Sequence, residues 1–280
     1  MHKIQVRTIK EPNLSGNFSI SNLNTLLAEK DMIEPIHRHD FFFILAIEKG
    51  KGEHQIDFSN YSISNYTFFI LRPSQVHQLT LKKGSKGFII AFDNSFYSPK
   101  EDLKKEMFST VSRVNYYKLT SKIYVKIIPI LEYIFSEYSN KKLMFRDHIK
   151  ANLDLLFIEL FRHNKSTNNN AINNSIHLAE TILELIDNHF YNNKQVSFYA
   201  EKLNLTTYQL NSITKKALEK NCSQLINERI LLEVKRYLIT TPNQVNEISY
   251  HLGYDDTSYF IRFFKKHTGL TPEAFRQSYK

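Results

Sequence analysis

This chain of 280 residues has a single cysteine, Cys222, and no long apolar run. One cysteine excludes an intrachain disulfide and any zinc site built from several cysteines. The longest apolar stretch, 41 FFFILAI 47, is far shorter than the ~18 residues that a membrane-spanning helix needs. The opening residues, MHKIQVRTIKEPN, lack the apolar core of a signal peptide. We therefore expect a cytoplasmic protein without a membrane partner.

Motifs for common enzyme chemistry are also missing. The sequence has no glycine-rich phosphate loop and no nucleophile motif. It therefore offers no catalytic residue and no cofactor site, and we expect the chain not to be an enzyme.

Positive charge is in excess, with a formal net charge of +9. Such an excess favours an acidic partner such as nucleic acid. Residues 1–175 hold 24 Lys and Arg against 17 Asp and Glu, whereas residues 176–280 hold 13 against 11. Any argument for DNA binding by the C-terminal half must therefore rest on where its charges lie.

A polar, Asn-rich segment, 164 NKSTNNNAINNS 175, separates two regions of different character. It lacks apolar periodicity and predicts a flexible linker between domains at 1–163 and 176–280. The alternative is a long surface loop within one domain.

The N-terminal half combines strand patterns with helical ones. Short apolar segments separated by Gly, Asn and Ser predict a small β-sandwich or barrel. Residues 121–138 and 144–163 have helical spacing, and Pro129 is expected to bend or interrupt the first. The fold class is therefore α+β with two domains. The predicted strands are 41–48, 53–58, 67–71 and 87–92.

The C-terminal half has helical patterns throughout. Its most informative helix is 257–267, which Asp256 is placed to cap at the start and Gly269 at the end, with Pro272 opening the next helix. A short helix over 244–251 and a turn at Gly253 precede it, which is the pattern of a helix-turn-helix. The other predicted helices are 176–190, 196–203, 207–218, 223–239 and 272–278. On a helical wheel, Thr257, Ser258, Ile261, Arg262 and Lys265 face outward, and Tyr259, Phe260, Phe263, Phe264 and His267 face inward.

A second copy of this pattern lies fifty residues earlier, over 196–218, with a turn at Asn204. Between the copies, 223–239 predicts one long helix. In the second helix of this copy, Tyr208, Asn211, Ser212 and Lys215 face outward, and Leu210, Ile213, Thr214 and Ala217 face inward.

The outward residue types suit DNA. Arg pairs bidentately with guanine, Asn, Ser and Thr reach base edges or phosphates, and Lys attracts phosphates. A single helix of this kind is more often only a solvated surface. Two copies on a stiff connecting helix can enter successive major grooves roughly 34 Å apart, which favours recognition of double-stranded DNA.

At these residues the chain resembles the AraC-type bacterial transcription regulators. The matching positions are Gly253-Tyr254, Ser258-Tyr259-Phe260, Arg262, Phe264-Lys265-Lys266, Gly269, Pro272 and Phe275-Arg276. The first copy departs from the family pattern at Asn204, Ser212, Thr214 and Glu219, and the second at Ser249. The resemblance implies an effector-responsive activator that works with RNA polymerase, and it implies more base reading by the second copy, with Arg262 as the principal base-reading residue.

The resemblance extends, more loosely, to the N-terminal half. In such regulators a cupin-like barrel binds an effector, and the helices after it form a homodimer. Here His37 and His39 are expected to open a strand, and Pro73 and His77 lie at a later corner of the barrel pattern. By resemblance, His37, His39, Arg72 and His77 are candidates for effector contact or structural hydrogen bonding.

Two other functions remain open. A metal-dependent cupin enzyme would need an acidic ligand after the His-x-His pair, and Phe42, Phe43 and Ile44 occupy those positions, with Glu48 too far along. We therefore expect no metal, although His39 and His77 could approach each other. The other alternative is a DNA-binding protein without an effector, whose barrel serves only for dimerisation.

Overall fold

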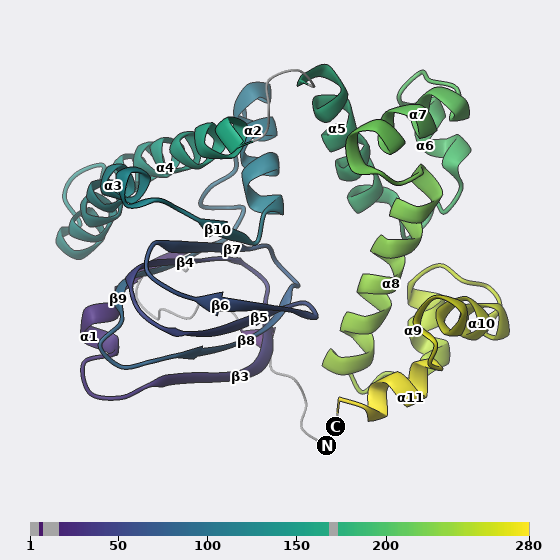
Figure 1. Cartoon of the computed structure of the whole chain (residues 1–280), viewed down its shortest axis with the longest axis horizontal. Helices are drawn as coiled ribbons and strands as arrows, with labels where there is room; N and C mark the ends of the chain where they lie inside the picture. Colours follow the sequence, from purple (N-terminus) through teal and green to yellow (C-terminus); the bar gives the residue numbers. More distant parts are fainter. Residues whose placement is uncertain (1–5, 8–16, 168–172, 280) are drawn as a thin grey trace. The chain divides into compact units, whose positions relative to one another are not determined.

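The computed structural model describes residues 6–7, 17–167 and 173–279. These residues form two compact parts, one on each side of the gap at 168–172 (Figure 1). Below they are called the N-terminal and the C-terminal part. No helix within the described ranges is both long and apolar enough to cross a bilayer.

The N-terminal part is built on two five-stranded sheets. One has the strand order β1-β3-β8-β5-β6 and the other the order β10-β7-β4-β9-β2. All pairs are antiparallel except β1 with β3. The strands are β1 (Val6–Arg7), β2 (Phe18–Asn22), β3 (Met32–His39), β4 (Phe42–Lys49), β5 (Gly52–Ile56), β6 (Ser59–Ile63), β7 (Thr67–Leu71), β8 (Val76–Leu81), β9 (Lys86–Phe92) and β10 (Tyr116–Lys118).

Strand β4 is buried on both faces, which explains why its sequence is a continuous apolar run. Phe43 and Leu45 belong to a core that includes residues of both sheets. Phe42 and Ile44, on the opposite face, belong to a core that they share with the helices. The predicted strands are present, but β1, β2, β3, β6, β8 and β10 were not predicted.

The helices of the N-terminal part cover the second sheet. They are α1 (Leu23–Leu26), α2 (Asp102–Arg113), α3 (Ser121–Asn140) and α4 (Phe145–Thr167). Helix α3 continues through Pro129, so the expected interruption there is absent. The buried side chains Tyr124, Ile127, Leu131 and Ile134 lie before and after Pro129 and join both halves of the helix to one core.

Helical structure enters the predicted linker from both ends. Helix α4 continues to Thr167, and α5 begins at Asn173. Only residues 168–172 of the segment 164–175 lie outside the described residues. The described ends of this segment are therefore helical, where the sequence predicted a flexible linker.

The C-terminal part is entirely helical in its described residues. Each helix begins and ends within about three residues of its predicted bounds, and side-chain caps fix the starts of α7, α8, α10 and α11. The helices are α5 (Asn173–His189), α6 (Val196–Lys202), α7 (Thr207–Leu218), α8 (Cys222–Thr240), α9 (Val245–His251), α10 (Thr257–Thr268) and α11 (Pro272–Gln277).

Candidate nucleic-acid interface and effector site

Helix α10 has the caps that the sequence predicted. The carboxylate of Asp256 accepts a hydrogen bond from the backbone N–H of Ser258 at 2.7 Å. Gly269 ends the helix with a φ of 79°, in the left-handed region. Phe260 and Phe264 are fully buried and fix which face points away from the protein.

The outward face of α10 presents a mobile basic group. Ser258, Arg262 and Lys265 are exposed, as predicted. The side chain of Arg262 is 70% exposed, and its ion contact with Asp256 is long, at 3.9 Å. A guanidinium held this loosely can rearrange toward a base edge or a phosphate at small energetic cost.

Three other predictions for α10 do not match the structure. Thr257 is half-buried, and its hydroxyl is buried without a hydrogen-bond partner among the described residues. It therefore does not face outward for DNA. Tyr259 is 55% exposed and His267 is exposed, although both were expected to face inward. The buried stripe of this helix is narrower than the wheel suggested.

Helix α7 presents a similar face with one difference. Tyr208, Ser212 and Lys215 are exposed, as predicted. Asn211 is half-buried, and its side-chain oxygen accepts a hydrogen bond from the backbone N–H of Cys222 at 3.0 Å. Asn211 thus ties α7 to the start of α8, and it also borders the surface hollow along α7, at the edge of the outward face.

The structure adds residues that the sequence did not single out. Ser223, at the start of α8, borders two surface hollows, one along α7 and one along α10. The outward faces of α7 and α10 therefore meet at α8 and form one surface, which we call the α7–α10 surface. Its further polar residues are Lys194, Lys216, Asn221, Asn227 and Lys266.

Lys194 also holds the turn before α10. Its ammonium group donates to the carbonyl of Gly253 at 2.7 Å and to that of Tyr191 at 3.0 Å. The same group lies 4.6 Å from the ring centroid of Tyr254. No local sequence signal indicates these contacts, because Lys194 is 59 residues away from Gly253.

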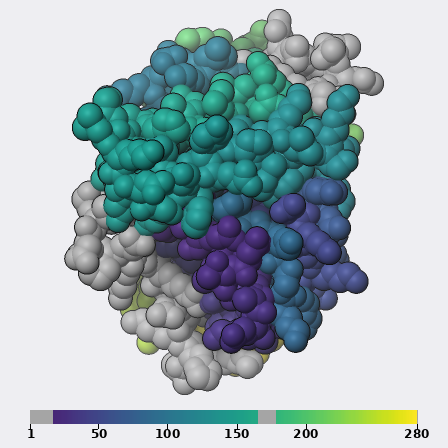
Figure 2. All heavy atoms as spheres, turned by 90° about the vertical axis from the view of Figure 1, so that its left-hand side faces the viewer, coloured from purple at the N-terminus to yellow at the C-terminus, as the bar shows by residue number. Residues whose placement is uncertain are grey.

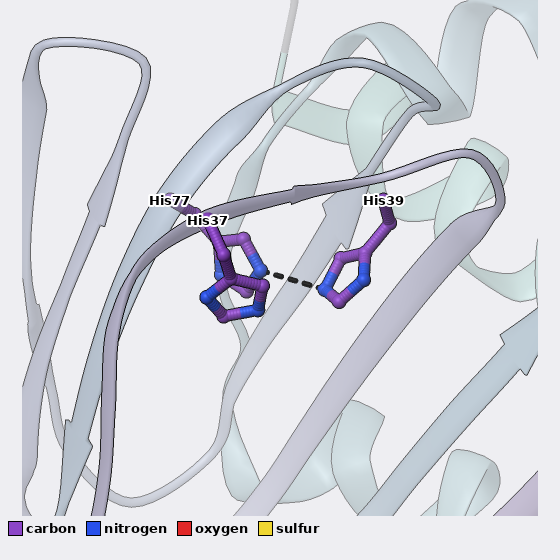
Figure 3. Close-up of side chains that lie close together, drawn as sticks. All are labelled: His37, His39 and His77. Atoms are coloured by element: carbon purple, nitrogen blue, oxygen red, sulfur yellow. Dashed lines mark hydrogen bonds between the residues drawn. The ribbon is translucent and has the colours of Figure 1, made fainter. Parts of the chain in front are cut away.

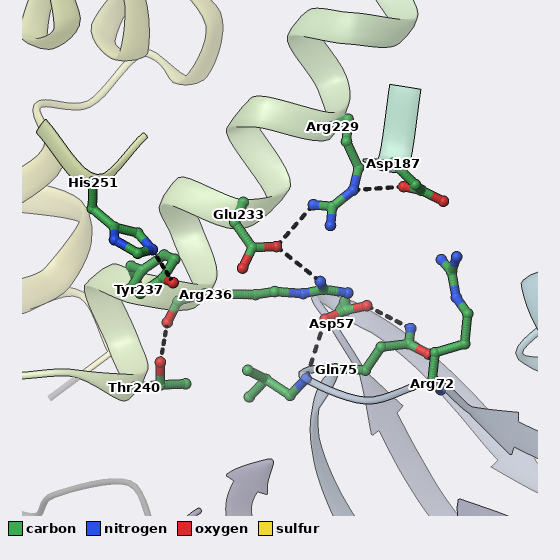
Figure 4. A network of polar contacts seen from close by, with 11 residues as sticks. Asp57, Arg72, Gln75, Asp187, Arg229, Glu233, Arg236, Tyr237, Thr240 and His251 are labelled. Atoms are coloured by element: carbon green, nitrogen blue, oxygen red, sulfur yellow. Dashed lines mark hydrogen bonds and ion pairs between the residues drawn. The ribbon is translucent and has the colours of Figure 1, made fainter. Parts of the chain in front are cut away.

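A buried ion-pair network stiffens α8, the helix that joins the two copies (Figure 4). The carboxylate of Glu233 lies 2.8 Å from Arg229 and 3.1 Å from Arg236, and Arg229 also pairs with Asp187 of α5 at 2.7 Å. Burial acts to raise the pKa of Glu233, but the charges of Arg236 and Arg229 hold that pKa below its ordinary value. Glu233 is therefore ionised at neutral pH.

In the N-terminal part, the structure brings three predicted histidines together (Figure 3). His37 and His39 end β3 rather than opening a strand, and His77 lies opposite His37 on β8. The Nε2 atoms of His39 and His77 are 2.7 Å apart. One ring nitrogen of each histidine lies within 4.8 Å of the others, so the set could hold a metal ion.

A fourth histidine, His54 of β5, was not predicted. It is fully buried, and its Nε2 lies 2.9 Å from Nδ1 of His77. Burial, with an electrostatic contribution from His37, lowers the pKa of His54 to about 3. The alternation of β5, in which His54 and Ile56 are buried, could have indicated its inward position.

Arg72 lies in the turn after β7. Its backbone N–H donates to the side chain of Gln75 at 2.7 Å, and Gln75 donates to Asp57 at 2.7 Å (Figure 4). The four residues proposed from the sequence for effector contact therefore divide into a buried histidine cluster and a polar corner.

Both parts of the chain match known family models. Residues 28–98 match a model described as an AraC-like ligand binding domain. Residues 199–278 match a model described as a helix-turn-helix domain.

Individual proteins are also similar to this chain in sequence or in structure. The HTH-type transcriptional activator RhaS of Escherichia coli O6:H1 is 21% identical over 275 residues, which cover 94% of each chain. The bifunctional transcriptional activator/DNA repair enzyme AdaA of Bacillus subtilis is 31% identical over 102 residues, 36% of this chain and 48% of AdaA. Among solved structures, fatty-acid-bound ToxT of Vibrio cholerae covers 95% of this chain and 97% of its own, at 17% identity and a TM-score of 0.43.

Proposed function

Because the chain belongs to the AraC family of transcription regulators, we propose that it is an activator whose helices α7 and α10 enter successive major grooves of one DNA duplex. The observation that carries this proposal is the α7–α10 surface. Ser223 borders both of its hollows, so the two outward faces are accessible from one side. A duplex needs this arrangement if both helices are to contact it at once.

We assign the residues of this surface by their chemistry. Arg262 reads bases, because its guanidinium is exposed and can form two parallel hydrogen bonds to guanine. Ser258, Tyr208 and Ser212 make further contacts to bases or phosphates. Lys215 and Lys265 attract phosphates. Asn211, which borders the hollow along α7, is a further candidate for contact with DNA, whereas the hydroxyl of Thr257 is buried.

Selection of bound sequences from random DNA tests this proposal. The full chain should enrich a site with two clusters of preferred bases, about 10–10.5 base pairs apart. A single short cluster, or no enrichment at all, would contradict the use of both helices. The genes beside enriched sites in the source genome would then identify the regulated process.

The boundaries of the DNA-binding part remain a proposal. We place the effector-binding and dimerisation domain at 1–163, the linker at 164–175 and the DNA-binding domain at 176–280. Support comes from the change to purely helical structure after the gap at 168–172. A fragment that lacks residues 1–163 should retain DNA affinity, and complete loss of binding would contradict autonomous recognition.

Helices α3 and α4 are the proposed homodimer interface. They form a broad band across one face of the N-terminal part (Figure 2). Apolar side chains are exposed on them and on the turn between them, including Val125, Tyr133, Leu143 and Leu155. Sedimentation should give a dimer mass, and Tyr133→Lys should shift the protein toward the monomer. A monomer at all concentrations would contradict the interface.

The relatives bear on whether this protein regulates transcription without catalysing a reaction. The curated relatives named above are transcription activators, although AdaA is also a DNA repair enzyme. We propose that this chain has no enzymatic activity, acts in the cytoplasm, and contacts RNA polymerase when it is bound to DNA. The metal-dependent cupin enzyme remains the alternative, and detection of a turnover reaction that requires the histidine cluster would favour it.

A further inference from the structure

The histidine cluster needs an explanation beyond core packing. His37, His39, His54 and His77 are at most 6% exposed, and they come from β3, β5 and β8. Their surroundings are aromatic: Phe41 and Phe43 lie against His39, and Phe69 lies against His54. Burying polar rings in such a place costs free energy unless they are hydrogen-bonded, and here the rings of His39, His54 and His77 bond to one another.

Hydrogen bonds orient two of the rings for a common ligand. Nδ1 of His37 lies 2.6 Å from the carbonyl oxygen of Pro35. A carbonyl can only accept, so this nitrogen carries the proton and Nε2 keeps its lone pair. In the same way, His77 can donate from Nδ1 to Nε2 of His54 and present its own Nε2 toward His39. Metal-binding histidines typically have this kind of partner on the nitrogen that does not bind.

The distances fit an ion after a small adjustment. A metal–nitrogen bond of ~2.0–2.1 Å in tetrahedral geometry separates two ligand nitrogens by about 3.3 Å. The Nε2 atoms of His39 and His77, now 2.7 Å apart, must move apart by about 0.6 Å. The other pairs of ligand nitrogens lie within 4.8 Å of each other and must approach by up to about 1.5 Å to reach this spacing.

The size of the site favours an ion over an organic effector. The core around the cluster is filled by buried side chains that include Phe41, Phe43, Leu45, Phe69 and Leu71. A single ion fits between rings that are already in contact, whereas an organic molecule would have to displace several of these side chains.

The donor set indicates the class of ion. Three imidazoles without a carboxylate suit zinc, nickel, cobalt or copper, whereas magnesium and calcium prefer oxygen ligands. Three histidines also leave a fourth position for water or an anion.

We propose that His37, His39 and His77 bind one divalent transition-metal ion, with His54 as a positioning residue behind His77, and that this ion is the effector of the regulator. The effector role of the ion rests on the proposed function, whereas the binding of the ion does not. Because His39 and His77 lie on different strands, the ion ties the end of β3 to β8. The carbonyl of His39 also accepts from Ser74 at 2.7 Å, which extends this tie to the turn before β8.

Metal stoichiometry tests the site. Full-length, untagged protein is stripped with a chelator, dialysed against Zn²⁺, Co²⁺, Ni²⁺ or Mg²⁺, and analysed for bound metal. We expect one Zn²⁺, Co²⁺ or Ni²⁺ per chain and no Mg²⁺. His39→Gln and His77→Gln should remove binding, whereas His148→Gln, at an exposed position on α4, should not. Absence of stoichiometric binding, or binding unchanged in both cluster variants, would overturn the site.

Two further measurements guard against misfolded variants. The visible spectrum of the Co²⁺-loaded wild type should show the intense bands of a four- or five-coordinate site, and the weak bands of a six-coordinate ion would overturn the geometry. His54→Gln should still bind one ion, but about 10–100-fold more weakly. Unchanged affinity in that variant would overturn the positioning role of His54.

Measuring DNA affinity with and without metal distinguishes the effector role of the ion from its binding. For a DNA site selected by the wild type, Zn²⁺ should change the affinity of the wild type at least about fivefold and leave that of His39→Gln unchanged. One bound ion per chain with no change in DNA affinity would overturn the effector role alone. Failure to bind any DNA sequence specifically would contradict the proposed function and leave the metal site intact.

Discussion

The two helix-turn-helix copies of this chain share a plan but differ in how firmly they are built. In the second copy, two phenylalanines anchor α10, and glycines occupy both left-handed positions, at Gly253 and Gly269. In the first copy, Leu210 and Thr214 anchor α7, and Asn204 and Glu219 occupy the left-handed positions. The second copy therefore has the larger buried anchor and the less strained backbone.

The turn lengths differ as well. The starts of α6 and α9 are 49 residues apart, and the starts of α7 and α10 are 50 apart. The second copy thus has one more residue between its two helices. A rigid second copy with an exposed arginine suits base reading, whereas the first copy suits positioning on the phosphate backbone.

The largest expected effect is on the free energy of unfolding, when the buried side chains that anchor α7 and α10 are truncated. Phe264 is fully buried against Phe275, and its counterpart Thr214 is buried with its hydroxyl donating to the carbonyl of Asn211. Phe264→Ala should lower the free energy of unfolding by about 3–5 kcal/mol, and Thr214→Ala by about 1 kcal/mol. Urea unfolding of the full chain measures both. Equal losses would mean that the two copies are equally anchored.

The connector between the copies should depend on Glu233. Glu233→Gln removes the buried carboxylate charge that pairs with both Arg229 and Arg236 and should cost about 3 kcal/mol at pH 7. The pKa of Glu233 is lower in the folded state, so its contribution is complete above the ordinary pKa of 4.5 and is lost as pH falls through the folded value.

The pH dependence of unfolding checks this prediction. Wild type should lose stability below pH 4.5 more steeply than Glu233→Gln does. Glu228→Gln is the matched control, because Glu228 lies on the same helix and forms an exposed pair with Lys220, which precedes that helix. Parallel pH profiles for all three proteins would show that the buried network does not stabilise the connector.

The turns should respond differently to substitution. Gly253 has a φ of 69°, and a Cβ there would lie 2.3 Å from the carbonyl oxygen of Tyr191. Gly253→Ala should therefore cost about 2 kcal/mol, whereas Asn204→Gly, at an exposed turn, should change stability by less than about 0.5 kcal/mol. Thermal unfolding compares them. Similar values would show that the second turn is no more constrained than the first.

Base reading should be concentrated in the second copy. Arg262→Ala should lose about 1–3 kcal/mol of binding free energy at the selected site and relax the preference for one base. Ser212→Ala, at the equivalent position of α7, should lose less and leave the base preference unchanged. Titration of selected and random DNA measures both. If Arg262→Ala weakened both DNAs equally, Arg262 would contact phosphate only.

Local signals in the sequence were sufficient for the helices of the C-terminal part. Asp256, Gly269 and Pro272 mark helix ends by their own backbone and capping preferences. The ends of these helices could therefore be predicted without knowing which residues pack against them. The inward assignment of Tyr259 and His267 was wrong because a helical wheel does not show how wide a stripe the packing neighbours cover. Here Phe260 and Phe264 alone are fully buried.

Long-range pairing explains what the sequence could not predict in the N-terminal part. His54 joins the cluster because β5 pairs with β8, which places Ile56 opposite His77. In the C-terminal part, the hydrogen bond of Asn211 could not be predicted either, because its partner, the backbone N–H of Cys222, lies in the next helix. The partner of a polar side chain is set by tertiary packing, and a periodic pattern does not contain it.

Simultaneous contact of α7 and α10 with one duplex is tested most directly by changing the spacing of a selected site. Five base pairs inserted between its two halves turn one half to the opposite face of the DNA. We expect the affinity of the full chain to fall at least about tenfold, with protection confined to one half. Unchanged affinity with both halves protected would contradict recognition by two helices held on one stiff connector.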